Sequence, residues 1–513
     1  MEILENNKRA LKHVMPKFLE QRLAAAGVKN VFLEMAADGE RIFGIERENR
    51  KWYLNSRYDT AFAAAVYAGR YQIRTYGTYF VFGFSDGRHV REFLKKCDDT
   101  NHIVICEPSV EIFEECCEQF DVSDILEDKR VQFYIPDATD SIEDIMKKNL
   151  QYSDFTFTEF CILPGYDILF HEECEEFQNL IIERMRDEAV KKGTSLSFQR
   201  VIPRNTLYNM KHTIRTRNIG QIREALEGYP LEDIPAVVVC AGPSLDKNIQ
   251  ELKKIQGRAL IIVVDAALRA VLRAGIHPDL VCTVDPNPPE RFFTDLDLRG
   301  LTWCCENASK PEIIQKYGER VYYFGYFEKG WNQTISEMLG YGFPVLPTGG
   351  SVSSIAFAMA LYFGFRKIVF MGQDLAFTGG KSHTSGIEGA LGDNDKYIKS
   401  RCLMEVEGID GTMLQTDFQM WYYKQWFEKA IRDGGDRMRV IDATEGGAKI
   451  EGAENMKMSE VVAGECPAEF DFRKIEQAIP PAFSVEEQQK LEKAYRKLKL
   501  QAGDLQKFIE KQI

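Results

Sequence analysis

The residues best suited to chemistry begin at a turn in the middle of the chain. A strand-like apolar run ends there in Cys-Ala-Gly-Pro-Ser at residues 240–244, and a helical pattern follows over residues 246–255. Gly242 lets the backbone approach a ligand closely, Pro243 lacks an N–H that a first helical turn would leave unpaired, and Ser244 adds a hydroxyl. Because a helix N-terminus binds anions well, we interpret the turn as a phosphate site or, equally, as a plain strand–helix turn.

Acidic residues follow three further strand-like runs, at residues 260–264, 280–284 and 367–371. The runs lead to Asp265, to Asp285 and, through a glycine and Gln373, to Asp374. A second glycine-rich turn at residues 348–351 opens an apolar helix over residues 352–363. In a doubly wound parallel sheet the carboxyl ends of the strands share one edge, and that edge holds the ligand. The predicted binding residues at this edge are Gly242, Pro243, Ser244, Leu245, Asp265, Asp285, Thr348, Gly349, Gly350, Ser351 and Gln373.

A long polar loop follows Asp374 and carries His383, the only histidine after His277. The loop covers residues 376–386 and is too rich in functional side chains for a tight turn, which is typical of a loop that covers a substrate. Because imidazole titrates near neutral pH, His383 is the candidate general base, and Asp374 would orient it or act in its place. The alternative for His383 is a solvated loop histidine. Lone acids such as Asp285 form no convincing ligand set, so no metal residues are assigned and metal dependence stays open.

The composition limits the class of protein. The 513 residues predict two to four domains, and a hydrophobic fraction of 44% is ordinary for a globular chain that buries a large core. The net charge of −13 argues against a general nucleic-acid or anionic-membrane surface, although not against a local basic pocket. No apolar run approaches the roughly 20 residues of a membrane span, and the polar N-terminus is unlike a secretory signal. The 12 cysteines form no CxxC pair, which is typical of free thiols in a reducing cytoplasm.

A smaller α/β pattern precedes this region. A strand-like run at residues 79–82 meets a glycine turn at 83–87, and a second run at 102–106 ends in Glu107. A glycine turn after one strand and an acid after the next is the layout of a Rossmann nucleotide site, and the pattern resembles a methyltransferase-type domain. Phe84 and Ser85 occupy positions where a cofactor loop is usually barer. We therefore predict a degenerate site, with a functional adenosyl-cofactor site as the alternative.

These patterns predict an α/β protein with a central Rossmann-like doubly wound parallel sheet, a smaller α/β domain before it and a helical region after it. The expected boundaries are residues 1–170 for the N-terminal α/β domain, 171–234 for a helical connector, 235–455 for the central domain and 456–513 for the helical C-terminal region. The last region has apolar side chains that recur at helical spacing, namely Leu491, Tyr495, Leu498, Leu505 and Phe508. This spacing favours packing onto the body over the alternative of a partner-binding face.

Taken in series, the motifs resemble the motility accessory factor (Maf) family of flagellin glycosyltransferases. The matching runs are Gly-Pro-Ser-Leu at 242–245, Asp-Ala-Ala-Leu at 265–268, Gly-Ile-His-Pro-Asp-Leu at 275–280, Thr-Gly-Gly-Ser-Val-Ser at 348–353, Gly-Gln-Asp-Leu-Ala-Phe at 372–377 and Thr-Glu-Gly-Gly-Ala-Lys-Ile-Glu-Gly at 444–452. The central domain is also similar to bacterial sialyltransferases that use CMP-sialic acid, and more distantly to an archaeal pterin diphosphokinase family. The sialyltransferases carry an extra Asn in their glycine turn, where this chain has Cys-Ala-Gly at residues 240–242.

The resemblance implies transfer of a nonulosonic acid (pseudaminic, legionaminic or sialic acid-like) from its CMP-activated form to Ser or Thr of flagellin. It implies a cytoplasmic reaction with inversion at the sugar, and it requires no cofactor. The CMP phosphate would rest on residues 242–245, Asp265 would contact the ribose, and residues 349–353 would cradle a phosphate or the sugar carboxylate. Two alternatives stay open. One is a diphosphokinase that uses ATP and magnesium with Asp279 and Asp285 as metal ligands, and the other is a non-catalytic flagellin-binding accessory protein.

Overall fold

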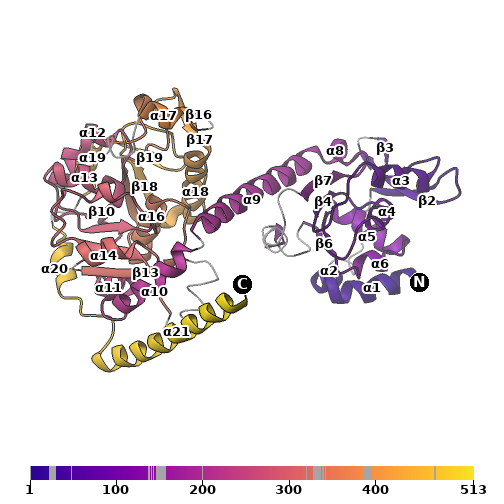
Figure 1. Cartoon of the computed structure of the whole chain (residues 1–513). Helices are drawn as coiled ribbons and strands as arrows, with labels where there is room; N and C mark the ends of the chain where they lie inside the picture. Colours follow the sequence, from indigo (N-terminus) through magenta and orange to yellow (C-terminus); the bar gives the residue numbers. More distant parts are fainter. Residues whose placement is uncertain are drawn as a thin grey trace. The chain divides into compact units, whose positions relative to one another are not determined.

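A computed structural model describes residues 2–21, 30–47, 49–136, 139, 141–142, 144–145, 157–198, 200–318, 320–326, 337, 340, 342–385, 394–401, 403–466 and 469–512. The chain divides into two compact units, Met1–Ser197 and Phe198–Ile513 (Figure 1). Both units contain parallel sheets, and the second unit ends in a helical region, so the predicted α/β fold class is confirmed. Among the described residues, no helix combines the length and the apolar character that crossing a bilayer requires.

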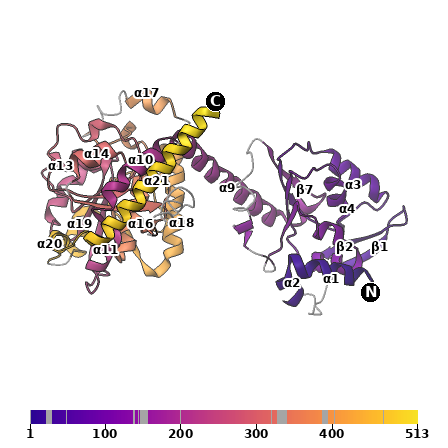
Figure 2. The ribbon, with the colours of Figure 1, turned by 60° about the horizontal axis from the view of Figure 1, so that its bottom comes forward.

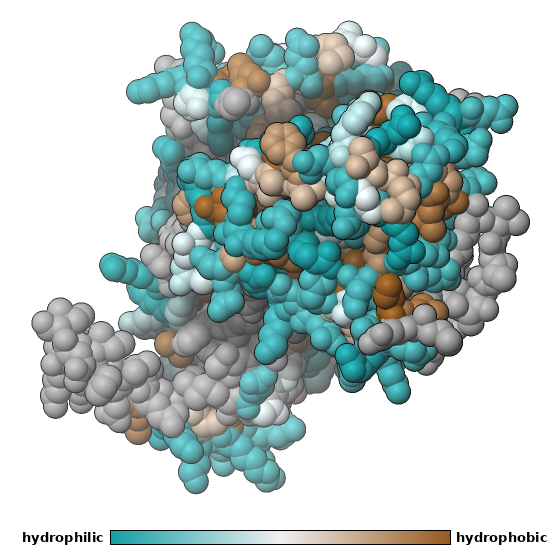
Figure 3. Space-filling model, turned by 90° about the vertical axis from the view of Figure 1, so that its right-hand side faces the viewer, coloured by the Kyte–Doolittle hydropathy of each residue, from teal (hydrophilic) through white to brown (hydrophobic). Residues whose placement is uncertain are grey.

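The first unit combines a short antiparallel sheet with a four-stranded parallel sheet of order β6-β5-β4-β7. Its strands are β1 (Val31–Met35), β2 (Arg41–Arg47), β3 (Arg50–Tyr53), β4 (Thr78–Phe82), β5 (His102–Cys106), β6 (Val131–Tyr134) and β7 (Thr158–Ile162). Its helices are α1 (Glu2–Val14), α2 (Pro16–Gln21), α3 (Thr60–Gly69), α4 (Arg88–Leu94), α5 (Val110–Gln119), α6 (Ser123–Leu126), α8 (Tyr166–Leu169) and α9 (His171–Phe198). Every residue of β4 is buried, as expected for the centre of a parallel sheet covered by helices. The molecular surface seen in Figure 3 is mostly hydrophilic.

A buried carboxylate closes the glycine turn of the first unit. Glu107 follows β5 and accepts the N–H of Phe84 at 2.8 Å and the hydroxyl of Tyr166 at 2.8 Å. The hydroxyl of Tyr166 in turn accepts the N–H of Ser85 at 3.0 Å. All four of these residues are buried. The donors that a nucleotide would use are bonded to groups of the protein itself, in agreement with a degenerate site.

The second unit is organised around one large parallel sheet of order β14-β13-β12-β11-β10-β9-β15-β18-β19. Its strands are β9 (Pro235–Val239), β10 (Leu260–Val264), β11 (Leu280–Thr283), β12 (Thr302–Glu306), β13 (Arg320–Tyr326), β14 (Val345–Leu346), β15 (Lys367–Met371), β18 (Arg439–Asp442) and β19 (Glu454–Asn455), with β8 (Arg217–Asn218) beside β13. Along the chain, the strands from β9 to β14 are added one after another on one side of β9. The chain then returns, and β15 pairs with β9 on its other side. The direction of winding therefore reverses between β9 and β15, which makes this edge the expected ligand position.

Helices cover the second sheet, and a hairpin of β16 (Leu403–Glu407) and β17 (Met413–Asp417) extends from it. The helices are α10 (Val201–Thr213), α11 (Ile219–Ala225), α12 (Leu245–Asn248), α13 (Asp265–Arg273), α14 (Pro311–Tyr317), α16 (Val352–Phe363), α17 (Asn394–Lys399), α18 (Phe418–Gly434), α19 (Met458–Gly464), α20 (Phe472–Gln477) and α21 (Val485–Gln512). Figure 2 shows α21 running over α10, where Leu491 and Tyr495 pack against Met210 and Ile214. The predicted packing of the C-terminal stripe onto the body is thus confirmed for Leu491 and Tyr495, and the side chains of its other members lie outside the described residues.

The helix predicted over residues 246–255 is wrong, and the difference weakens the anion site expected at its N-terminus. The helical pattern over residues 246–255 forms only the four-residue helix α12, followed by a 3-10 helix at Ile249–Lys254. The macrodipole of a helix grows with the number of aligned peptide units, so a helix of this length attracts an anion weakly. The helix α16 has 12 residues, and its N-terminus carries a capping box in which Ser351 and Ser354 bond each other's backbone groups.

The closed turn of the first unit generates a test. Replacing Tyr166 by phenylalanine removes a buried hydroxyl that serves both Glu107 and the N–H of Ser85. We expect Tyr166→Phe to lower the opening free energy of the first unit by about 1–3 kcal/mol, measured by hydrogen exchange of the β4 and β5 amides. Tyr58→Phe is the matched control because Tyr58 is 78% exposed. Equal protection in both variants would show that the Glu107–Tyr166 contact does not hold the turn.

Candidate functional site

The candidate site lies where the winding of the second sheet reverses. The parallel pairing of β9 with β15 brings the segments that follow them to one edge. The N–H of Gly242 donates to the carbonyl oxygen of Gly372 at 2.8 Å. The carboxylate of Asp374 accepts the hydroxyl of Ser244 at 2.7 Å and the N–H of Ser244 at 3.2 Å. The structure therefore joins three predicted site residues, Gly242, Ser244 and Asp374, in one hydrogen-bonded cluster.

This cluster changes the role expected for the first glycine turn. The N–H groups of Gly242, Ser244 and Leu245 donate to protein oxygens, and Pro243 has no N–H. Ser244 is fully buried, and the carboxylate of Asp374 holds the position that the sequence predicts for a phosphate. A phosphate at this turn would have to displace that carboxylate, so the assignment of the turn to CMP phosphate stays a prediction.

The charges around Asp374 also disfavour a further anion there. Burial raises the pKa of the Asp374 carboxyl, and the hydrogen bonds from Ser244 oppose that shift. Asp442, the last residue of β18, has its pKa raised to about 6, chiefly by burial and in part by the charge of Asp374. The Thr444 hydroxyl accepts the N–H of Gln373 at 3.2 Å beside these acids. Two buried acids at one turn repel a phosphate, because like charges in a desolvated region destabilise one another.

The second glycine turn is the more accessible of the two predicted anion sites. Gly350 is exposed, and Ser351 and Ser353 are half-buried at the N-terminus of α16. Ser353 forms a side-chain hydrogen bond with Cys240, which follows β9, so this turn lies beside the first one. The first N–H groups of a helix have no acceptor within it and carry the positive end of its dipole. The N–H groups of Gly349 and Ser351 donate to the Ser354 hydroxyl and that of Gly350 donates to the Thr348 hydroxyl. Of the predicted cradle at residues 349–353, the N–H groups of Val352 and Ser353 are therefore the donors left for an anion.

Aromatic side chains of α18 explain why glycines are required in this second turn. A Cβ atom on Gly349 would lie 2.4 Å from the Trp426 ring, and one on Gly350 would lie 3.2 Å from the Tyr423 ring. The helix α18 begins at the N-cap Asp417, whose side chain accepts the N–H of Met420. The aromatic-rich segment of the sequence is thus a wall of the α16 turn, a role that its composition alone did not indicate.

The acids that follow β10 and β11 lie along the same edge. Asp265 is 3% exposed and accepts the Thr283 hydroxyl at 2.7 Å and the N–H of Ala266 at 2.8 Å. Burial raises the pKa of Asp265 to about 6, and the nearby charge of Asp285 adds to the rise. Asp285 is only half-buried and accepts the N–H of Asn287 at 2.7 Å. The less buried Asp285 therefore carries the more accessible carboxylate.

The structure does not bring together the metal ligands of the diphosphokinase alternative. Asp279 precedes β11 and Asp285 follows it, so the two carboxylates belong to opposite edges of the sheet. Asp279 accepts the N–H of Ile261 at 2.9 Å at the amino edge. The charge of Arg473 lowers the pKa of the Asp279 carboxyl and that of Asp471 raises it. Within the described part of the chain, no group of three or more His, Cys, Asp or Glu side chains is arranged to hold a metal ion.

The loop that bears His383 is tied to the first glycine turn. The N–H of Thr384 donates to the carbonyl oxygen of Ala241 at 2.9 Å, and the N–H of Ser385 donates to Asp246 at 3.0 Å. His383 is half-buried, which lowers its pKa to about 4, with a smaller contribution from the charge of Arg401. The imidazole is therefore neutral at pH 7, but a pKa this far below neutral makes it a weaker base than the sequence-based assignment assumes. The last residue predicted for this loop, at position 386, lies outside the described residues.

Sequence reasoning missed two asparagines that position the edge. The Asn205 side-chain amide donates to the carbonyl oxygens of Pro286 and Ala308, each at 2.9 Å. Asn209, one helical turn further along α10, holds the carbonyl oxygens of residues 307 and 309 in the same way. Both asparagines are 1% exposed, and together they fix the loops that follow β11 and β12. A pair of amides four residues apart in an otherwise amphipathic helix is the signal that could have indicated this role.

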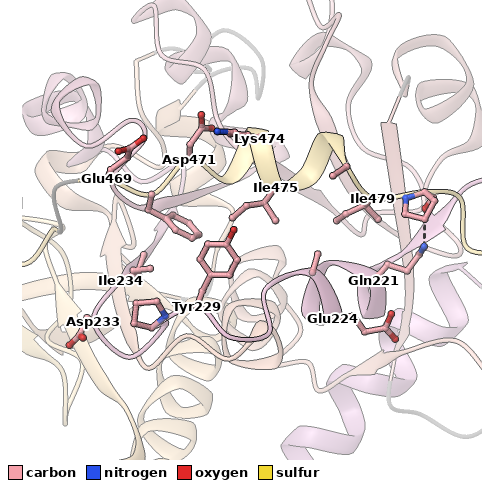
Figure 4. A pocket seen from close by; sticks show the side chains of 15 residues that line it. Gln221, Glu224, Tyr229, Asp233, Ile234, Glu469, Asp471, Lys474, Ile475 and Ile479 are labelled. Atoms are coloured by element: carbon pink, nitrogen blue, oxygen red, sulfur yellow. Dashed lines mark hydrogen bonds between the residues drawn. The ribbon is translucent and has the colours of Figure 1, made fainter.

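A large cavity lies away from this site, at the amino edge of the second sheet. It has a volume of about 1040 Å³ and is formed by α11, by the segment before β9 and by α20 (Figure 4). Tyr229, Ile234, Ile475 and Ile479 line its apolar part, with Glu224 and Glu469 among its acids. Because ligands of doubly wound sheets bind at the carboxyl edge, size alone does not make this cavity the functional site.

Comparisons with known proteins point in two directions. A family model described as 6-hydroxymethylpterin diphosphokinase MptE-like matches residues 204–380. A solved structure of a MAf glycosyltransferase from Magnetospirillum magneticum AMB-1 matches with a TM-score of 0.62 and 17% identity, over 96% of this chain and 78% of that chain. No curated protein matches the sequence. The structural likeness shows a shared fold, and at that level it confirms the resemblance to Maf glycosyltransferases seen in the motifs.

The close approach at Gly242 can be tested directly. A Cβ atom there would lie 2.1 Å from Asp374 Oδ2 and 2.5 Å from the carbonyl oxygen of Gly372. We expect Gly242→Ala to lower the free energy of unfolding of the second unit by about 1–3 kcal/mol, measured by hydrogen exchange of the β9 and β15 amides. Gly464→Ala is the control because no atom lies within 4 Å of its Cβ position. Unchanged protection in Gly242→Ala would contradict the packing of Asp374 on the turn.

The raised pKa of Asp265 predicts a pH-dependent stability with a definite sign. Its pKa is about 6 in the folded chain against an ordinary value of 3.8 for an aspartate, so the folded state holds a proton that the unfolded state has released. This contribution is fully present below about pH 4 and is lost as the pH rises through about 6, up to about 3 kcal/mol in all. Asp265→Asn should therefore match the natural chain in urea unfolding at pH 4 and exceed it at pH 7.5. The same difference at both pH values would refute this protonation.

Proposed function

We propose that the chain is a glycosyltransferase, which moves a sugar from a nucleotide-activated donor to an acceptor hydroxyl. The observation that carries this proposal is the meeting of Asp374, the His383 loop and the accessible N-terminus of α16 at the reversal point of the sheet. One edge thereby brings a helix N-terminus that can face an anion and a neutral imidazole together, and such a transfer uses both. The fold that the chain shares with a MAf glycosyltransferase supports the same class of reaction.

The finer assignment rests on the motifs. Their resemblance to the Maf family and to CMP-sialic acid sialyltransferases supports a CMP-activated nonulosonic acid as donor and Ser or Thr of flagellin as acceptor, in the cytoplasm. The described cysteines are free thiols and most are buried, which is compatible with a reducing compartment. In this proposal the nucleotide and the sugar are substrates, and no resident cofactor takes part.

The reaction follows from the groups at the edge. A ring nitrogen of His383 takes the proton of the acceptor hydroxyl, and the oxygen of that hydroxyl forms a bond to the anomeric carbon of the sugar. The bond from that carbon to the phosphate oxygen breaks, and its electron pair leaves with CMP. The N–H groups of Val352 and Ser353, at the start of α16, stabilise the charge that develops on the phosphate. Attack from the face opposite the leaving group gives inversion.

The ribose contact is revised by the geometry of the edge. The sequence predicts that Asp265 accepts from ribose hydroxyls, yet both of its oxygens already accept hydrogen bonds from the protein. Asp285 is less buried, and its negative charge raises the pKa of Asp265. In this proposal Asp285 receives the ribose hydroxyls, and Asp265 instead holds the end of β11 through the hydroxyl of Thr283.

The diphosphokinase alternative has one observation in its favour, the family model that matches residues 204–380. Its chemistry would use a divalent metal held by paired carboxylates, which would supply positive charge to the phosphates of ATP. The separation of Asp279 from Asp285 by the whole length of β11 removes the pair that the sequence suggested. Glycosyl transfer does not need that pair, so it accounts better for this edge.

The proposed base can be tested by separating binding from transfer. In a host that supplies a CMP-nonulosonic acid and flagellin, we expect the chain to raise the intact mass of flagellin by whole sugar units. His383→Ala should lower the transfer rate by about 100-fold or more, the usual contribution of a general base, and leave the affinity for CMP unchanged in calorimetry. His277→Ala, on an exposed loop before β11, is the matched control.

Each failure of this experiment has a distinct meaning. Transfer that persists in His383→Ala would move the base to another residue, and loss of CMP affinity would move His383 into the donor site. A chain that is stabilised in thermal unfolding by ATP with magnesium but not by CMP would favour the diphosphokinase. No stabilisation by either nucleotide, together with unmodified flagellin, would favour a non-catalytic accessory protein.

A further inference from the structure

An arginine that no motif indicated lies beside the proposed base. Arg401 stands between α17 and β16, and its side chain is 33% exposed. Its guanidinium carbon lies 4.7 Å from the centre of the Tyr397 ring, and Nη2 donates to the Tyr397 hydroxyl at 2.5 Å. The ring of Tyr397 is also 6.5 Å from that of His383. Tyr397 thus lies next to both the cation and the base.

The same guanidinium is connected to the N-terminus of α16. Its Nη1 atom is 3.5 Å from the Gln419 side-chain oxygen, and the amide of Gln419 donates to the Tyr423 hydroxyl. Tyr423 packs against the turn at Gly350. A chain of side chains, Gln419 and then Tyr423, therefore links the positive charge to the turn before α16.

The charge of Arg401 is only partly balanced by these neighbours. Its Nε atom is 3.4 Å from a carboxylate oxygen of Asp417, and the other oxygen of Asp417 accepts the N–H of Met420. The contacts of Nη1 and Nη2 are to the neutral groups of Gln419 and Tyr397. A guanidinium that is one-third exposed and bonded at its outer edge to neutral groups can exchange them for an anion without leaving a buried charge unpaired.

We propose that Arg401 is the specificity-determining residue of the site and that it binds the carboxylate of an acidic donor sugar. A planar guanidinium matches a carboxylate with two parallel hydrogen bonds, whereas the donors of a helix N-terminus suit a phosphate. The division gives the phosphate to α16 and the sugar carboxylate to Arg401, whose partner Tyr397 has its ring 6.5 Å from that of His383. This inference rests on the proposed function, because it names the class of sugar that the glycosyltransferase accepts.

Binding the carboxylate would also act on the base. The charge of Arg401 lowers the pKa of His383, so an anion paired with Arg401 removes part of that effect. The titratable groups that act on Arg401 itself are Tyr397, Asp417 and Tyr423, and none of them has to change its protonation state for this effect. His383 would then become a stronger base when an acidic donor is bound, which couples recognition of the sugar to transfer.

The test compares ligands that differ in one charge. Calorimetry at pH 7.5 uses CMP, CMP-N-acetylneuraminate and the carboxyl methyl ester of CMP-N-acetylneuraminate. In the natural chain we expect the acid to bind at least roughly tenfold more tightly than the ester, the usual value of one charge-assisted contact. Arg401→Gln should bind the acid and the ester equally, with CMP affinity unchanged, and Arg401→Lys should keep part of the preference. Arg299→Gln, which removes an exposed arginine paired with Asp297, should behave as the natural chain does.

Three results would overturn the inference. Equal binding of acid and ester by the natural chain, with CMP still bound, would show that the carboxylate is not recognised while leaving the proposed function intact. A full preference for the acid in Arg401→Gln would move the contact to another residue. Loss of CMP affinity in a folded Arg401→Gln would make Arg401 a phosphate ligand. Absence of binding of CMP and of both donors would instead sink the proposed function itself.

Discussion

The hydrogen bonds between Ser244 and Asp374 join the two strand ends on which the candidate site depends. They link the segment after β9 to the segment after β15, where the winding of the sheet reverses. The chain that continues from Asp374 returns to the same turn through the N–H of Thr384, which donates to Ala241. His383 is held next to the sheet edge by this return. If Asp374 were withdrawn from Ser244, both the turn and the loop would lose their common anchor.

The two units of the chain close their glycine turns by the same physical means. In the first unit Glu107 accepts the N–H of Phe84 and the hydroxyl of Tyr166, and in the second Asp374 accepts from Ser244. A carboxylate of the protein stands in both cases where a nucleotide phosphate or ribose would be expected. In the second unit the N-terminus of α16 lies beside the closed turn, because Ser353 forms a side-chain hydrogen bond with Cys240. In our proposal the anion of the donor binds at this second turn.

Much of this fold follows from patterns in the sequence, and much of the site does not. Apolar runs that end in Asp265 and Asp285 predict parallel strands and their shared edge, because strand ends must meet in a doubly wound sheet. Spacing could not reveal that Asp374 fills the first turn, since that contact joins residues 130 positions apart. The 3-10 segment after Leu245 and the role of Arg401 also depend on tertiary contacts. Sequence periodicity reports which face of an element is buried, and it does not report which polar group lies opposite.

The most direct test of the central claim is hydrogen exchange of the full chain with and without saturating CMP. The account predicts that CMP slows exchange at the N-terminus of α16, residues 349–354, and in the loop around His383, while β4 and the Glu107 turn of the first unit are unaffected. Slowed exchange confined to the Glu107 turn, or to the cavity lined by Tyr229 and Ile475, would place the nucleotide elsewhere and contradict the account.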